Sequence, residues 1–252
     1  MNCKIISNDE VMPSVSLMWL EAPEIAASAK PGQFVMLQCG GDTLLRRPIS
    51  IHRVKDSRIA VLYANLGRGT DWLSKQKASA SISVLGPLGN GYTIDEGSQN
   101  LLLIAGGMGI APMPFLAETA LAQNKNVALL IGARSNEILL PQNLLPADVE
   151  CIIATDDGSV GICGRTTDVL PDCLGDIDSV FACGPAPMYR TMNSSGLLKG
   201  RPCQVSLEIR MACGVGVCYG CTIKTTRGLK QVCDDGPVFE FSDILWDELA
   251  DI

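Results

Sequence analysis

Histidine is nearly missing from this sequence, since its 252 residues include only one, His52. The shortage excludes a Rieske-type iron–sulfur centre, because that centre takes two histidine ligands on one of its irons. We expect His52 to be a strand or surface residue and not a ligand. Any metal centre in this chain must therefore draw its ligands from other residue types.

Basic residues are also scarce and are spread thinly. The sequence has 20 lysines and arginines against 27 aspartates and glutamates, which gives a formal net charge of -7. A nucleic-acid surface requires clustered lysine and arginine side chains to neutralise phosphates. The composition therefore argues against a nucleic-acid partner and favours protein partners or small cofactors held by local donors.

Long unbroken apolar runs are absent as well. The main uncharged run, Leu101 to Ala117, approaches the length of a membrane span, but three glycines and two prolines interrupt it. We expect a buried strand, a turn and the start of a helix there. The N-terminal residues include Lys4, Asp9 and Glu10 and lack the apolar core of a signal peptide.

Cysteine, in contrast, is abundant, and four of the eleven cysteines follow the pattern C-x4-C-x2-C-x11-C. That spacing is typical of a plant-type [2Fe-2S] cluster, in which each iron takes two thiolates. Glycines between the cysteines would let a short loop wrap the cluster with backbone N–H groups directed at its sulfurs. The four candidate metal ligands are Cys213, Cys218, Cys221 and Cys233, and the glycines are Gly214, Gly216 and Gly220.

Two other interpretations of these cysteines remain open. A structural zinc site is one, although zinc ribbons usually pair two C-x2-C knuckles and this chain has a single knuckle. Plain buried thiols are the other. The seven remaining cysteines show no pairing pattern, which favours a reducing cytoplasm. They are Cys3, Cys39, Cys151, Cys163, Cys173, Cys183 and Cys203.

The hydrophobic pattern divides the chain into three parts, and its length and 47% hydrophobic content suffice for two compact domains. Up to about residue 98, short β-patterned runs between glycine and proline turns predict a small antiparallel barrel. The clearest runs are residues 34–38, 49–54 and 58–63. Residues 99–203 alternate apolar strands with helix-length segments, which predicts a parallel α/β domain. Its predicted strands are residues 101–105, 127–131, 151–155 and 180–183.

Residues 204–252 form the third predicted part, which holds the four cysteines. Residues 222–226 and 229–232 predict a hairpin around Arg227-Gly228. The acidic tail carries Ile244, Leu245 and Leu249 at a spacing that suits a short surface helix. We found neither an internal repeat nor a low-complexity segment.

Two segments of the predicted barrel could contact a phosphorylated cofactor. Within Arg46-Arg47-Pro48-Ile49-Ser50, a strand-borne guanidinium could hold a pyrophosphate while a nearby hydroxyl reaches an isoalloxazine ring. Gly67-Arg68-Gly69-Thr70 precedes a helix-like stretch, residues 71–76, where N–H groups could converge on an anion. The structural alternatives are a basic pair on an edge strand and an ordinary loop before a helix. Residues 86–92 form a glycine-rich turn to which we assign no chemical role.

Two segments of the predicted α/β domain could bind a dinucleotide. Residues 105–112 follow an apolar strand and open a helix, where glycines let a pyrophosphate approach the backbone. The third glycine of the usual fingerprint is missing, and Pro112 lies nearby instead. Cys183-Gly184-Pro185 ends a later strand, and open α/β sheets bind ligands at such ends. A tight structural turn remains the alternative at both places.

Taken in order, these segments resemble the ferredoxin-reductase superfamily, and within it the electron-transfer subunits of NAD-dependent (class 1B) dihydroorotate dehydrogenase. The resemblance covers nearly the whole chain, and its most specific part is SLEIRMACGVGVCYGC, residues 206–221. The other matching segments are residues 47–50, 69–70, 86–91, 107–112, 155–159 and 183–185.

The resemblance implies that the barrel holds FAD and that the α/β domain receives NAD. Arg47 would contact the FAD pyrophosphate, Ser50 the flavin, and Gly69 with Thr70 a phosphate. Many superfamily members carry an aromatic residue where this chain has Ile49. Arg134 could meet the 2′-phosphate of NADP, so the preference for NAD follows from the resemblance alone. The implied FAD residues are Arg47, Pro48, Ile49, Ser50, Leu62, Tyr63, Ala64, Gly69 and Thr70, and the NAD residues are Gly107, Gly109, Cys183, Gly184 and Pro185.

The resemblance also implies a place in pyrimidine biosynthesis. A separate FMN-containing catalytic subunit would oxidise dihydroorotate, and electrons would pass through the [2Fe-2S] cluster and FAD of this chain to NAD+. Two copies of each chain would assemble, with the neighbourhood of Met211 and Tyr219 either presented to the partner or packed around the cluster. Two alternatives stay open: a reductase subunit of a hydrogenase, sulfite reductase or ferredoxin-NADP transhydrogenase, and a zinc-bearing scaffold protein without redox chemistry.

Overall fold

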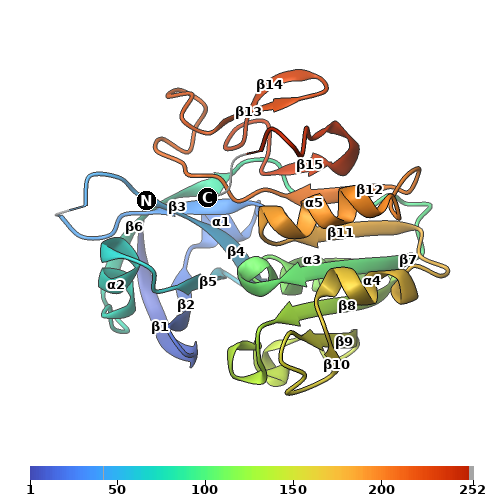
Figure 1. The fold of residues 1–252 in the computed structure, drawn as a ribbon. Helices are drawn as coiled ribbons and strands as arrows, with labels where there is room; N and C mark the ends of the chain where they lie inside the picture. Colours follow the sequence, from blue (N-terminus) through green and yellow to red (C-terminus); the bar gives the residue numbers. More distant parts are fainter. Residues whose placement is uncertain (42, 250–252) are drawn as a thin grey trace.

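The computed structural model describes residues 1–41 and 43–249, which form a β-barrel, an α/β sheet and a C-terminal segment that packs against both (Figure 1). The barrel is closed by antiparallel strands in the order β1-β2-β5-β4-β3-β6. All three β-patterned runs predicted in this part are confirmed, as β3, β4 and β5. The six strands are β1 (Asn2–Met12), β2 (Val15–Glu21), β3 (Phe34–Leu37), β4 (Arg47–Lys55), β5 (Arg58–Ala64) and β6 (Ser81–Leu88).

Alternate residues of these strands fill the barrel interior, as the two-residue period of a strand requires. Ile5, Val35, Ile51 and Val61 are buried there in one apolar cluster. The short helix α1 follows β2, and α2 follows β5 at the end of the barrel. Their bounds are α1 (Pro23–Ala26) and α2 (Arg68–Ser74).

The second part is a seven-stranded sheet in the order β10-β9-β8-β7-β11-β12-β15. Its first six strands are parallel, and β15 runs antiparallel to β12. All four predicted strands are confirmed, whereas β10, β12 and β15 were not predicted. The strands are β7 (Asn100–Gly106), β8 (Asn126–Ala133), β9 (Glu150–Thr155), β10 (Ile162–Cys163), β11 (Ser179–Cys183), β12 (Cys203–Ser206) and β15 (Val238–Glu240).

Helices cover both faces of this sheet, because β7 is apolar on both sides. Leu101 and Leu103 face the cluster that contains helix α3, while Leu102 and Ile104 face the cluster that contains α4 and α5. Residues 101–117 therefore form a strand, a turn and the start of a helix, as predicted. The helices are η1 (Gly107–Ile110), α3 (Met113–Ala122), η2 (Asn136–Ile138), η3 (Gln142–Leu144), α4 (Thr166–Cys173) and α5 (Ala186–Ser195).

The C-terminal segment confirms the predicted hairpin but not the predicted surface helix. Strands β13 (Thr222–Thr225) and β14 (Gly228–Gln231) pair with each other, and a single 3-10 turn, η4 (Phe241–Asp243), follows β15. Residues 244–249 are not helical, and Ile244 and Leu249 are 4% and 8% exposed. The surface-helix prediction is wrong because these apolar side chains pack into the core around Trp246 instead.

The barrel and the sheet meet where strand β4 packs against helix α3. The Nδ1 atom of His52 lies 2.7 Å from the carbonyl oxygen of Ala111, just before α3. Beside it, Arg53 and Glu118 form an ion pair of 2.9 Å. His52 is fully buried, so the expectation of a strand residue was correct and that of a surface residue was wrong.

Burial lowers the pKa of His52 to about 4, and the nearby positive charge of Arg53 acts in the same direction. The imidazole is therefore neutral near pH 7, and its Nδ1–H group donates to the Ala111 carbonyl oxygen. Within the described residues, Nε2 has no hydrogen-bond partner. Of the helices formed by residues 1–41 and 43–249, none is long and apolar enough to cross a membrane.

Lowering the pH should destabilise the protein through His52. The unfolded histidine takes up a proton near pH 6.5 while the folded one resists protonation down to about pH 4, so stability falls as the pH decreases through this window. We expect a loss of about 2 kcal/mol between pH 6.5 and 5 relative to His52→Gln, measured by urea unfolding. An equal loss in the variant would contradict this assignment.

Candidate functional site

The four cysteines of the predicted cluster lie together in one loop and the strand-to-turn segment that faces it. Each sulfur accepts a backbone N–H group at 3.1 to 3.5 Å. The donors are Val215 to Cys213, Gly216 to Cys233, Gly220 to Cys218, and the N–H of Cys233 itself to Cys221. Backbone dipoles thus point at the sulfurs, as an anionic metal centre requires.

Two glycines allow the loop to adopt this path. Gly214 and Gly216 have φ values of +74° and +76°, a region that residues with a Cβ atom rarely occupy. Gly214 also lies against the barrel, where an added Cβ would come within 2.7 Å of the Met36 side chain. The predicted role of the glycines in wrapping the loop therefore has a direct structural basis at both positions.

The four sulfurs are close enough to act on one another: Cys218 acts on Cys213, and both Cys221 and Cys213 act on Cys233. The N–H group of Val215 and the neighbouring Cys218 lower the pKa of Cys213 to about 6, which favours a thiolate. Burial raises the pKa of Cys233, while the Gly216 N–H group acts in the opposite direction. Four neighbouring sulfurs are the ligand number that a [2Fe-2S] cluster requires, two for each iron.

A single zinc ion fits this arrangement less well. Zinc requires its ligands around one point, at about 2.3 Å from each sulfur. Among the described residues, no three His, Cys, Asp or Glu side chains form a group that could hold a single ion. The observation that favours a [2Fe-2S] cluster over zinc is the spacing of the four cysteines, because zinc ribbons usually carry two C-x2-C knuckles and this chain has one.

At the barrel, the two adjacent arginines point in different directions. Arg46 is held by the barrel wall, because its guanidinium donates to the carbonyl oxygen and the hydroxyl of Ser83, at 3.0 and 2.9 Å. Arg47 extends over the first turn of α2, where a Cβ atom on Gly69 would lie 2.8 Å from its Nε. Of the two, Arg47 is the one directed toward the glycine turn.

The glycine turn and helix α2 are close to the prediction, although α2 begins at Arg68 and not at residue 71. Thr70 lies inside the first turn, and its hydroxyl oxygen accepts the N–H groups of Leu66 and Gly67, at 2.9 and 3.2 Å. The hydroxyl is therefore engaged within its own loop. A phosphate here would meet the N–H groups at the start of the helix, which have no intrahelical acceptors.

The remaining barrel residues alternate between the interior and the outer face. Ile49 packs against the barrel core, which places its neighbours Pro48 and Ser50 on the opposite face. On β5, Leu62 belongs to the apolar cluster shared with the sheet, whereas Tyr63 is buried in the barrel and donates to Asn8 at 2.8 Å. The Tyr63 side chain is thus occupied inside the barrel.

The two predicted dinucleotide segments come together at the carboxyl ends of β7 and β11, which are neighbouring parallel strands. A Cβ atom on Gly109 would lie 1.9 Å from the carbonyl oxygen of Cys183, so only glycine permits this contact. Gly107 has φ +55° and nothing within 4 Å of its missing side chain. Pro185 is the residue just before helix α5. The space around the Cα atom of Gly107, on the side where a side chain would lie, is open.

Sequence reasoning missed several groups at this junction. Tyr92 and Tyr189 are buried there; the Tyr92 hydroxyl donates to the carbonyl oxygen of Ala182 at 2.9 Å, and the Tyr189 hydroxyl lies 3.3 Å from the same oxygen. Glu208 follows β12, and the surrounding protein raises the pKa of its carboxyl group by desolvation, although the side chain keeps a surface open to solvent. Tyr92 and Glu208 lie in segments 86–92 and 206–221, which the sequence singled out without assigning a role to either side chain, and Tyr189 lies in no such segment.

Arg134 follows β8, and the structure gives it acidic neighbours that the sequence did not predict. The N–H group of Asp157 donates to the carbonyl oxygen of Arg134 at 3.2 Å, and that of Asp156 donates to Ala133 at 3.0 Å. The loop after β9 therefore lies directly beside the Arg134 loop. The backbone contacts thus bring Asp156 and Asp157 beside Arg134.

The chain is similar to known proteins over its whole length. The family described as "Iron-sulfur cluster binding domain of dihydroorotate dehydrogenase B" matches residues 208–245. Proteins named "Dihydroorotate dehydrogenase B (NAD(+)), electron transfer subunit" are 35% identical in Caldanaerobacter subterraneus subsp. tengcongensis and 35% identical in Desulforamulus reducens, with 98% of each chain covered in both cases.

Solved structures show the same fold. A structure of NADH-dependent reduced ferredoxin-NADP oxidoreductase superposes with a TM-score of 0.89 and 28% identity, covering 98% of this chain and 91% of that one. A ferredoxin NADP+ reductase from Neisseria gonorrhoeae with bound FAD and NADP superposes with a TM-score of 0.68 at 19% identity, covering 79% of this chain and 91% of that one.

Gly109→Ala and Gly107→Ala should differ in stability, because an added Cβ atom is sterically blocked at Gly109 and has free space at Gly107. The Cβ atom of the first variant would collide with the Cys183 carbonyl, and we expect a loss of about 3 kcal/mol or more in the free energy of unfolding. The second variant meets open space and should lose only about 1 kcal/mol, from its positive φ. Urea unfolding measures both, and equal losses would contradict the close contact.

Proposed function

The chain belongs to the family of dihydroorotate dehydrogenase B (NAD(+)) electron transfer subunits, and on that premise we propose that it carries electrons between a dihydroorotate-oxidising partner and NAD+ in pyrimidine biosynthesis. The loop with four sulfurs, each facing a backbone N–H group, is the observation that carries this proposal. When bound, FAD and a [2Fe-2S] cluster supply the redox chemistry, because a flavin joins one-electron carriers to a two-electron nicotinamide.

The proposed cluster ligands are Cys213, Cys218, Cys221 and Cys233. The N–H groups that face them would offset the negative charge of the bound cluster, and this charge balance is one of the factors that set its reduction potential. The exposed side chains of Val217 and Tyr219, 72% and 70% exposed, lie on the same loop. We propose that this part of the loop, with Met211, faces the FMN-containing catalytic subunit in an assembly of two copies of each chain.

The proposed FAD site lies between β4, the end of β5 and the start of α2. Arg47 would pair with the pyrophosphate, and its place over Gly69 supports this role, because it brings the guanidinium to the N–H groups of the helix start. Ser50 would face the flavin from the outer side of β4. Pro48, Ile49, Leu62, Tyr63, Ala64, Gly69 and Thr70 complete the proposed site, with Tyr63 contributing its backbone.

The proposed NAD site is formed by Gly107, Gly109, Cys183, Gly184 and Pro185. The open space beside Gly107 supports it, since a dinucleotide needs close access to the backbone. Asp156 and Asp157 beside Arg134 support a preference for NAD, because carboxylates repel a 2′-phosphate and can accept ribose hydroxyl groups.

We also propose the domain division 1–98, 99–203 and 204–252, with β12 and β15 linking the last two parts through the sheet. A cytoplasmic location is proposed as well, and it is supported by the seven cysteines outside the proposed cluster, none of which forms a disulfide in the described part of the chain. A reductase subunit that serves another redox complex would share these cofactors and differ only in its partner, and the high structural similarity to the ferredoxin-NADP oxidoreductase keeps that alternative in view.

Co-purification under anaerobic conditions, followed by an assay of dihydroorotate-dependent NAD+ reduction, tests the function. Recovery of an FMN-containing partner with this activity supports the proposal. A partner from a hydrogenase or a sulfite reductase would contradict the dihydroorotate assignment. Zinc without iron or flavin in the purified chain would instead support a non-redox scaffold protein.

Cys218→Ser should uncouple the two activities. Loss of one ligand removes the cluster, so dihydroorotate-dependent NAD+ reduction should fall by about a hundredfold or more, while NADH oxidation by an artificial acceptor at FAD persists. Cys173→Ser is the control, because Cys173 lies on helix α4, outside the proposed cluster, FAD and NAD sites. Loss of both activities in Cys218→Ser would contradict separate FAD and cluster sites.

Arg47→Ala should weaken FAD retention by about tenfold to a hundredfold, the effect of losing a charge-assisted contact. The measurement is flavin released on dialysis, followed by titration with FAD. Arg46→Ala is the control, because the Arg46 guanidinium is bound to Ser83 in the barrel wall. It should lower stability and leave FAD affinity intact, and the opposite ranking of the two variants would overturn the role of Arg47.

A further inference from the structure

The hydroxyl group of Tyr189 connects three backbone segments at the carboxyl end of the sheet. Its oxygen accepts the N–H group of Gly184 at 3.0 Å, and it donates to the carbonyl oxygen of Ser206 at 2.7 Å. The carbonyl oxygen of Ala182 lies 3.3 Å from the same hydroxyl. Tyr189 is 1% exposed, so water does not replace these bonds. One side chain therefore ties the turn after β11 to the end of β12.

The turn that Tyr189 holds has little freedom on its other side. The Cys183 carbonyl oxygen lies so close to Gly109 that no side chain fits between them. Met188, from the first turn of α5, packs against Gly184, where an added Cβ would lie 2.5 Å from its Cε. The Gly184 N–H group is thus directed inward, and the Tyr189 oxygen is the acceptor that satisfies it.

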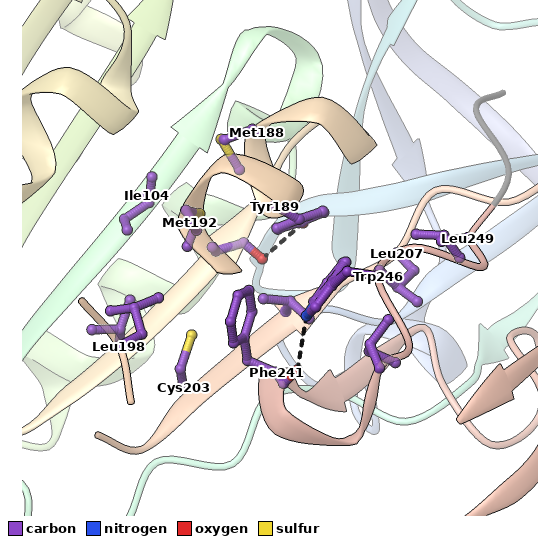
Figure 2. Close-up of a cluster of buried hydrophobic side chains, with 14 of the residues drawn as sticks. Ile104, Met188, Tyr189, Met192, Leu198, Cys203, Leu207, Phe241, Trp246 and Leu249 are labelled. Atoms are coloured by element: carbon purple, nitrogen blue, oxygen red, sulfur yellow. Dashed lines mark hydrogen bonds between the residues drawn. The ribbon is translucent and has the colours of Figure 1, made fainter. Parts of the chain in front are cut away.

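The ring of Tyr189 is itself supported by the C-terminal tail. Trp246 packs against it with ring centroids 5.0 Å apart, and Phe241 packs against Trp246 at 4.8 Å. Figure 2 shows these rings beside one another, with the indole N–H group bonded to the carbonyl oxygen of Phe241. Arg190, next along α5, donates to the carbonyl oxygen of Trp246 at 3.2 Å and so anchors the tail to the same helix.

We propose that Tyr189 is a positioning residue for nicotinamide dinucleotide binding, which acts through the Cys183-Gly184-Pro185 turn, and that the C-terminal tail holds it in place through Trp246. This inference rests on the proposed NAD site. Tyr189 makes its contacts from behind the turn, so its role is to fix the backbone that the dinucleotide would meet.

Loss of the hydroxyl should act on binding and not only on stability. Without it, the buried Gly184 N–H group has no acceptor in the binding conformation, so the turn shifts toward other conformations. A ligand then binds more weakly in proportion to the lost population of the competent turn. The strands on either side stay paired through their own ladders, so the fold as a whole persists.

Tyr189→Phe removes the hydroxyl and keeps the ring, and Tyr92→Phe is the matched control. Tyr92 is also buried, and its hydroxyl donates to the same Ala182 carbonyl oxygen that the Tyr189 hydroxyl approaches, but the Gly184 N–H group of the turn donates to Tyr189 and not to Tyr92. In the FAD- and cluster-loaded complex, we expect Tyr189→Phe to weaken NAD+ binding by about five- to tenfold in calorimetric titration. Tyr92→Phe should lower the unfolding midpoint and leave NAD+ affinity within about twofold. FAD content and the cluster spectrum should match wild type in both variants.

Each outcome decides a separate point. Unchanged NAD+ affinity in Tyr189→Phe, or an equal loss in Tyr92→Phe, overturns the positioning role. Failure of the wild-type complex to bind NAD+ overturns the proposed NAD site itself. If Tyr189→Phe does not fold, amide hydrogen exchange in the wild type decides: a Gly184 amide that exchanges as fast as that of Gly107 contradicts the inference, and strong protection supports it.

Discussion

A group of sulfur atoms that each accept a backbone N–H group is the constraint on which the rest of this molecule depends. Four thiolates held close together repel one another, and a chain can keep them there only by directing dipoles at them. The loop meets this requirement with glycines at Gly214 and Gly216, where the backbone turns through conformations that other residues avoid. Met36 of the barrel then closes over the loop, so the cysteines are positioned by the barrel as well as by their own segment.

The three parts of the chain converge on a small region at the carboxyl ends of β7, β11 and β12. The glycine loop after β7 lies against the Cys183 turn, and β12 leads from the Tyr189 contact at Ser206 toward Cys213. The barrel reaches the same region through His52 and the Ala111 carbonyl. The order of the strands therefore brings the proposed FAD, NAD and cluster sites close to one another.

Much of the architecture was readable from the sequence, because its strands are apolar and its turns carry glycine. The runs that became β3, β4, β5, β7, β8, β9 and β11 were predicted, as was the hairpin around Arg227-Gly228. Strands β12 and β15 were missed because each is short and contains polar residues, so neither forms an apolar run. The tail was misjudged because the apolar spacing of Ile244 and Leu249 suits a helix, while packing against Trp246 decides their actual conformation.

The candidate sites divide in the same way. Cysteine spacing identified the cluster loop, since its ligands lie close together in sequence, and the glycine segments marked the nucleotide turns. The sequence did not reveal that Gly109 meets Cys183, because nothing in it states that β7 and β11 are neighbours. Tyr189 stayed hidden for a similar reason: a tyrosine inside a helix looks ordinary until its hydroxyl is seen to reach two other segments.

The antiparallel pairing of β12 with β15 has a consequence for how this chain could change during evolution. The whole cysteine-bearing stretch leaves the sheet at Ser206 and returns at Val238, which are paired with each other. Its two ends are therefore fixed at the separation of neighbouring strands, about 4.8 Å. Its length can therefore vary between these fixed ends only where the core contacts of Cys221, Ile223 and Val232 are kept, so variation is confined to the exposed tips of the stretch.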